Sequence, residues 1–258
     1  MSLWREVVVF AAALTAGAIN SIAGGGTLIS FPTLLWIGRD PIMANATNTV
    51  ALWPASVAGM MGFRQELSES KRWLLFLVIP SFAGGATGAV LLIHTSSQTF
   101  SLIIPYLILG ATILLAAQEL ITRKMRVVAI TEGSHETSMW RAGAFLFQFF
   151  VGVYGGYFGA GIGILMLAAL GLIGLTDMHQ MNGLKNLLAL VVNGIAALYF
   201  IFSGAVIWID VLIMAVASVM GGYFGARLAR RLGRPFVRGF VVVIGLVMTL
   251  SLFLKAHH

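Results

Sequence analysis

The chain has 258 residues, of which 59% are hydrophobic and only 10% are charged. An ordinary soluble domain has roughly 25% charged residues, so this composition cannot cover a soluble surface. The mean hydropathy is +0.95, and apolar runs fill nearly the whole chain. These runs also exclude disordered, collagen-like and nucleic-acid-binding proteins, which leaves an integral membrane protein surrounded by lipid.

The net charge of +7 does not indicate a polyanionic partner. The 16 Lys and Arg residues lie mostly in short segments between apolar runs, a distribution that orients a membrane protein. The chain has no cysteine, which excludes disulfides, thiolate metal sites and a cysteine nucleophile. We expect no cofactor and no metal. His257 and His258 are treated as remnants of a purification tag and set aside.

The apolar pattern predicts about eight transmembrane helices, since each crossing needs about 20 mostly apolar residues. They lie at about 4–22, 42–63, 73–93, 99–118, 139–158, 178–202, 205–226 and 235–254. Two further apolar stretches, 27–37 and 162–174, are too short to cross easily, and each follows a glycine cluster. We predict that each is a re-entrant half-helix after a broken span.

Arg5 and the following apolar run resemble a signal peptide, but this segment has a counterpart later in the chain, which argues against cleavage.

The two halves of the chain match in four blocks that keep the same order and nearly the same offset. The matches pair 17–26 with 152–161, 48–52 with 186–190, 84–89 with 221–226, and Gly110 with Gly245. Such a pattern indicates an internal duplication. We therefore assign 1–118 to a first transmembrane repeat, 119–138 to a cytoplasmic linker and 139–258 to a second repeat.

The distribution of Lys and Arg among the loops predicts that the two repeats have opposite orientations in the membrane. Loops 64–72, 119–138 and 227–234 are basic, whereas 94–98 and 203–209 contain no Lys or Arg. If the basic loops are cytoplasmic, equivalent loops of the two halves face opposite sides of the membrane. Inverted repeats with broken helices are a recurring plan of transporters, in which the substrate binds where the repeats meet.

Lys185 is the residue that most directly suggests a function. It lies about 13 Å along its predicted helix from Thr176, near the middle of the membrane. A central lysine costs roughly 2.5–3.5 kcal/mol, so it is a functional candidate, although a lysine that snorkels to the surface is the alternative. Asn182, Asn186 and Asn193 share its helix face, within an arc of about 100°. Asparagines also join helices by hydrogen bonds, which is our interpretation of Asn193.

The first repeat has a corresponding polar helix, which contains Asn45, Thr47 and Asn48. The glycine clusters would add backbone N–H groups as hydrogen-bond donors. Half-helices that begin after Gly26 and Gly161 would present N–H groups and a positive dipole end to an anion, although glycines also permit tight helix packing. The predicted substrate-binding residues are Lys185, Asn182, Asn186, Asn48, Thr47, Asn45, Gly25, Gly26, Thr27, Gly159 and Gly161.

The chain resembles the TauE/SafE family of sulfite and organosulfonate exporters over essentially its whole length. The resemblance rests on Ala23-Gly24-Gly25-Gly26-Thr27-Leu28 with Pro32 after it, on Asn45-Ala46-Thr47-Asn48-Thr49, and on the glycines from 152 to 163. It implies export of small sulfur-containing anions, such as sulfite or sulfoacetate, across a bacterial inner membrane.

Other classes of function stay open to different degrees. An intramembrane enzyme needs paired acids, metal ligands or an activated nucleophile, and the predicted spans contain no acidic residue well inside them. We therefore expect no enzymatic activity. A passive anion channel fits the same pattern as a transporter, and a scaffold protein would leave Lys185 without a role. The sequence also shows no obvious proton carrier that could drive transport.

Overall fold

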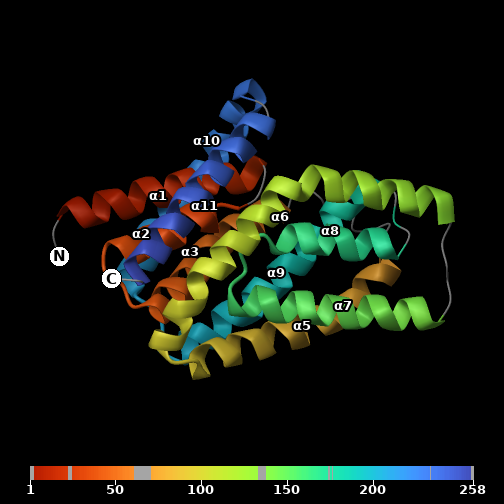
Figure 1. The fold of residues 1–258 in the computed structure, drawn as a ribbon, viewed down its shortest axis with the longest axis horizontal. Coiled ribbons are helices and arrows are strands. Elements are labelled where there is room, and N and C mark those ends of the chain that lie inside the picture. The colour runs from red at the N-terminus through yellow and green to blue at the C-terminus, as the bar shows by residue number, and fades with distance from the viewer. Residues whose placement is uncertain are drawn as a thin grey trace.

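The computed structural model describes residues 3–22, 25–60, 71–132, 138–173, 175, 177–232 and 234–256, and all regular structure in these ranges is helical. In chain order the helices are α1 (Leu3–Ile22), α2 (Thr27–Trp36), α3 (Pro41–Met60), α5 (Lys71–His94), α6 (Ser97–Glu132), α7 (Ser138–Tyr157), α8 (Ile162–Leu172), α9 (Met178–Phe202), α10 (Trp208–Leu232) and α11 (Arg234–Ala256) (Figure 1). The all-helical fold class is thus confirmed. Ala23, Gly24, Thr176 and the loop residues 64–70 and 133–137, used in the sequence analysis, lie outside the described residues.

Each predicted helix corresponds to an observed one, and the main difference is the length of α6. The apolar run predicts an end at 118, but α6 continues to Glu132 through the first part of the predicted linker. Residues 119–132 contain no Gly or Pro and are rich in good helix formers, so the helix continues after its membrane-spanning part ends. Hydropathy marks where a helix leaves lipid, not where the helix itself ends.

Among the described residues, five helices are long and apolar enough to cross a membrane by length and composition, namely α1, α5, α6, α9 and α11. Helices α7 and α10 contain shorter apolar stretches, Ala142–Tyr157 and Trp208–Phe224. Helix α3 is less apolar because several Asn and Thr residues lie within it. The outer surface is rich in large apolar side chains, such as Leu75 and Val247 at 69% and 59% exposure, as lipid contact requires.

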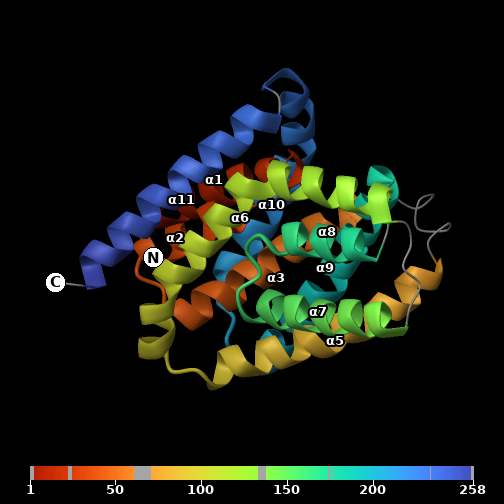
Figure 2. The ribbon, with the colours of Figure 1, turned by 45° about the vertical axis from the view of Figure 1, so that its right-hand side comes forward.

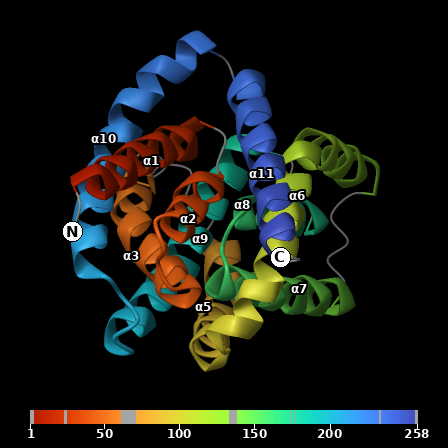
Figure 3. The same ribbon diagram turned by 60° about the vertical axis from the view of Figure 1, so that its left-hand side comes forward.

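The two halves of the chain are interlocked by two long helix pairs. Helix α5 packs along α7 (Figure 2), and α1 packs against α10 (Figure 3). Both pairs depend on close backbone approach at a glycine. A Cβ added to Gly84 would lie 2.3 Å from the backbone oxygen of Phe149, and one added to Gly221 would lie 1.9 Å from that of Leu14. Any larger residue would therefore force these helices apart.

Helices α3 and α9 cross in the centre and join the two halves a third time. Trp53 Nε1 donates a hydrogen bond to the backbone oxygen of Leu190 at 3.2 Å. The Trp53 ring covers Gly194, where an added Cβ would lie 3.0 Å from Nε1. The helices that contain the predicted polar residues are therefore in direct contact.

Candidate functional site

Two chain breaks interrupt the helices where the sequence analysis expected them. Gly25 lies between α1 and α2 with a φ of +91°, and Gly159 and Gly161 lie between α7 and α8 with φ of +81° and +75°. Side chains with a Cβ disfavour this left-handed region, so glycine allows each turn. The interruptions expected at the two glycine clusters are thus present in the described residues, between α1 and α2 and between α7 and α8, whereas the re-entrant course of α2 and α8 is still a prediction.

Helix α6 brings the two breaks close to each other. A Cβ at Gly161 would lie 3.7 Å from Cα of Ala111, and one at Gly25 would lie 3.2 Å from Cδ2 of Leu115. Ala111 and Leu115 are four residues apart on α6, which is about 6 Å along the helix. Both breaks therefore meet the same part of α6.

Aromatic side chains fill the space between α2 and the second break. The ring centroids of Phe31 and Phe158 are 5.5 Å apart, and those of Phe31 and Phe100 are 6.4 Å apart. All three rings are almost completely buried. A cavity between the breaks is still only a prediction, because packed rings occupy this part of the structure.

Lys185 lies against the beginning of α8. A Cβ at Gly163 would lie 3.3 Å from Cδ of Lys185, and the Lys185 ammonium donates to Oδ1 of Asn182 at 3.2 Å. Lys185, Asn182 and Asn186 are all half-buried on α9. Within the part of the chain that the structure describes, the N–H groups of Gly161 and Gly163 have no backbone acceptor. The predicted cation and the predicted half-helix N-terminus are therefore neighbours.

The beginning of α2 differs from that of α8, because a side chain already binds its backbone N–H. Oδ1 of Asn20 accepts a hydrogen bond from the N–H of Gly26 at 2.8 Å. Gly155, which the predicted repeat pairs with Asn20, has no side chain that could act in this way at α8. Thr27 is the first residue of α2 and is half-buried. Asn20 is not among the predicted site residues, although asparagine is a preferred residue for capping helix N-termini.

The three predicted site residues of α3, Asn45, Thr47 and Asn48, each connect to a different segment, and each is at most 2% exposed. Asn45 donates from Nδ2 to the backbone oxygen of Tyr157 at 3.0 Å. Asn48 accepts from the Ser30 hydroxyl at 2.5 Å, and Thr47 accepts from the N–H of Ile207 at 3.0 Å. These bonds attach α3 to the second break, to α2 and to the loop before α10. That Asn48 and Lys185 contact one ligand is still a prediction.

One buried acceptor of this group has no partner. Among the described residues no donor lies within hydrogen-bond distance of Asn45 Oδ1. A buried acceptor without a partner costs about 1–3 kcal/mol. A water molecule or a protonated ligand would supply the missing donor.

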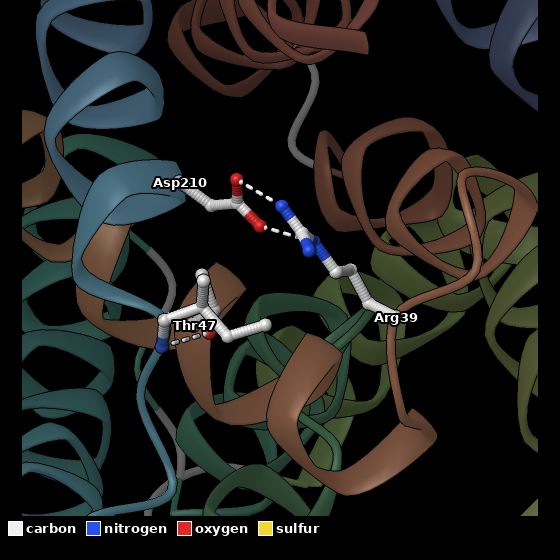
Figure 4. A network of polar contacts seen from close by, with 4 residues as sticks. Arg39, Thr47 and Asp210 are labelled. Atoms are coloured by element: carbon white, nitrogen blue, oxygen red, sulfur yellow. Dashed lines mark hydrogen bonds and ion pairs between the residues drawn. The ribbon is translucent and has the colours of Figure 1, made fainter. Parts of the chain in front are cut away.

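The structure also contains an ion pair that the sequence analysis missed. Arg39, in the loop after α2, donates from Nε to Asp210 Oδ2 at 2.7 Å and from a terminal nitrogen to Oδ1 at 2.9 Å (Figure 4). The Asp210 side chain is 1% exposed and that of Arg39 is 19% exposed. The two residues are 171 positions apart, so no local pattern could connect them.

The apolar helices, the broken spans and the half-buried lysine define a multi-pass membrane protein. The comparisons with known proteins agree. The family model described as "Sulfite exporter TauE/SafE" matches residues 9–252, so the chain belongs to this family, as its resemblance implied.

Three curated relatives from bacteria cover nearly the whole chain. A probable membrane transporter protein of Haemophilus influenzae is 27% identical over 94% of this chain and 92% of its own length. The probable membrane transporter protein YfcA of Escherichia coli strain K12 is 30% identical over 97% and 90%. The probable membrane transporter protein ORF9 of a Sinorhizobium species is 25% identical over 96% and 92%. No solved structure matches the chain. The relatives are named as transporters and not as enzymes.

Proposed function

We propose that the protein exports a small sulfur-containing anion, either sulfite or an organosulfonate such as sulfoacetate. The observation that carries this proposal is the position of Lys185 against Gly163 in the first turn of α8. An ammonium beside a helix N-terminus combines a full positive charge with backbone donors and the positive end of the helix dipole. The family name supports an anionic substrate of this class.

Asn182 and Asn186 complete the proposed site. Asn182 accepts a hydrogen bond from the lysine ammonium through Oδ1, so it positions the charged group of the proposed site. Asn186 lies next to Lys185 on the same helix face. A bound anion would offset the free-energy cost of placing a lysine at this depth. The lysine in turn would compensate the charge of an anion that lipid cannot solvate.

The proposed inverted repeats account for how the helices pair. Gly84 and Gly221 are aligned between the halves, and so are their contacts, Phe149 and Leu14. The pairing of α5 with α7 therefore has an equivalent in the pairing of α10 with α1. We propose that the two halves rock against each other and expose the site alternately, as in other transporters with inverted repeats.

Efflux from proteoliposomes tests the proposed function. Vesicles loaded with radiolabelled sulfite should show counterflow when unlabelled anion is added outside, and Lys185→Ala should abolish it. Arg238→Gln is a matched control, because it removes one positive charge from an exposed pair with Glu119. A flux that rises linearly with concentration and shows no counterflow would indicate a passive channel instead. Turnover of the anion without a membrane would indicate an enzyme.

A further inference from the structure

The Arg39–Asp210 pair joins the two halves of the chain beside the polar face of α3. Arg39 follows α2 in the first half, and Asp210 lies in the first turn of α10 in the second. One turn from the pair, the N–H of Ile207 binds the Thr47 hydroxyl (Figure 4). Asn48, one of the predicted substrate-binding residues, is the next residue along α3.

The geometry of this pair resembles the recognition of an oxyanion. Two guanidinium nitrogens of Arg39 bind the two oxygens of one carboxylate. The planar fork of arginine binds other oxyanions with two oxygens at similar spacing in the same way, and sulfonate and sulfite both present such oxygens. Asp210 therefore occupies the position that a transported oxyanion would take on Arg39.

Burial limits this position to one negative charge. Asp210 is 1% exposed, and a second anion beside its carboxylate would be uncompensated and poorly solvated. An oxyanion can replace the carboxylate on Arg39 only if Asp210 becomes neutral. A proton on Asp210 achieves this and leaves the net charge of the site at zero.

We propose that Arg39 is a second anion site, at which a sulfonate or sulfite replaces Asp210 while Asp210 takes up one proton. In the resting state Arg39⁺ pairs with Asp210⁻. In the loaded state Arg39⁺ pairs with the oxyanion, and an O–H bond has formed on the Asp210 carboxyl group. No bond within the anion is made or broken. The identity of the anion rests on the proposed function, but the exchange on Arg39 does not depend on Lys185.

Among the described residues, Arg39 is the basic residue that pairs with Asp210, and the other charged groups around α10 lie elsewhere. Helix α10 packs against α1, α3 and α11. Helix α1 contains Arg5, which lies over the Trp4 ring at 5.6 Å, and Glu6. Helix α3 has no charged residue, and Asp40 before it accepts from the N–H groups of Ile42 and Met43. On α11 Arg238 pairs with Glu119, and Arg234 and Lys255 lie at its two ends.

Calorimetry on the purified full-length protein tests the exchange, with methanesulfonate as the probe because it does not titrate near neutral pH. Titrations in buffers of different ionisation enthalpy report the number of protons taken up per anion. Wild type should take up one proton for each anion bound at Arg39, and the affinity of that site should fall about tenfold per pH unit as pH rises. Asp210→Asn should bind the anion there without proton uptake and without this pH dependence.

Two further variants make the result unambiguous. Arg39→Gln/Asp210→Asn has no charge at this position and should lose the Arg39 site while keeping the Lys185 site. Lys185→Ala should keep the proton-linked binding, so failure of the proposed function is distinguished from failure of the exchange. Thermal unfolding of each variant checks that it is folded. If Asp210→Asn unfolds, the neutral double variant tests the site by its expected loss of both anion binding and proton uptake at position 39. Equal proton uptake by wild type and by Asp210→Asn, or equal binding by wild type and by the double variant, would overturn the proposal.

Discussion

Lys185 and Gly163 fit against each other so closely that a Cβ at position 163 would lie 3.3 Å from Cδ of the lysine. The lysine stem therefore passes directly over the first turn of α8. This contact places the lysine stem beside the N-terminal end of α8, where we propose that backbone N–H groups bind the anion. A glycine at position 163 is what makes the approach possible.

Gly163→Ala should therefore weaken anion binding without unfolding the protein. The added methyl group displaces the flexible lysine stem by a few tenths of an ångström, and we expect affinity for methanesulfonate to fall several-fold in calorimetry. Gly110→Ala on α6 is the matched control, because a Cβ at Gly110 has no atom within 4 Å. It should leave binding unchanged and stabilise the helix by about 0.5–1 kcal/mol. Equal affinity in wild type and Gly163→Ala would show that the lysine stem is not held by this contact.

Gly84→Ala and Gly221→Ala should both destabilise the protein strongly. Their Cβ atoms would lie 2.3 Å and 1.9 Å from backbone oxygens of the partner helix, which cannot move aside as a flexible side chain can. Overpacking of this kind typically costs about 1–3 kcal/mol. Thermal unfolding in detergent measures the loss, with Gly143→Ala as a control in open space. Unchanged melting temperatures would contradict the close α5–α7 and α1–α10 pairs.

Asn20→Ala should lower stability but leave anion affinity at the Lys185 site unchanged. The substitution removes the acceptor of the Gly26 N–H, and losing a capping side chain costs about 0.5–2 kcal/mol. Thermal unfolding and calorimetry on the same preparation separate the two effects. A large loss of affinity would mean that the beginning of α2 contributes directly to the site, as the sequence analysis originally expected of both half-helices.

The orientation of the repeats is testable because the chain has no cysteine. The charge pattern predicts that position 96, between α5 and α6, faces outside and that position 230 faces the cytoplasm. Ser96→Cys and Arg230→Cys should react with a membrane-impermeant maleimide from opposite sides of oriented vesicles. Reaction of both from the same side would exclude inverted repeats.

Helix positions and chain breaks could be predicted from the sequence because they depend on local properties. Hydropathy marks the spans, and the glycines at 25, 159 and 161 mark positions where the backbone has a positive φ. The surroundings of Lys185 could be predicted in part, since its helix face shows its polar neighbours. The contact between Lys185 and Gly163 depends on how α8 packs against α9. The spacing of residues along the sequence does not define that packing.

The Arg39–Asp210 pair and the Asn20 cap could not be predicted for a different reason. Arg39 and Asp210 each lie near a predicted helix end, where a charged residue is ordinary, and only the fold brings the two together. Asn20 lies in an apolar helix, and its role depends on the chain returning toward it at Gly26. Tertiary contacts of single polar residues leave no periodic pattern in the sequence.

Equilibrium binding to wild type and to Lys185→Ala tests the central claim most directly. Calorimetry with sulfite and with methanesulfonate should show binding to wild type at the Lys185 site and its loss in Lys185→Ala, with thermal unfolding confirming that the variant is folded. Lys185→Arg should restore binding only in part, because a planar guanidinium needs a different geometry from an ammonium with three donors. Equal affinity of wild type and Lys185→Ala for both anions would contradict the account and leave Lys185 as a lysine that snorkels to the membrane surface.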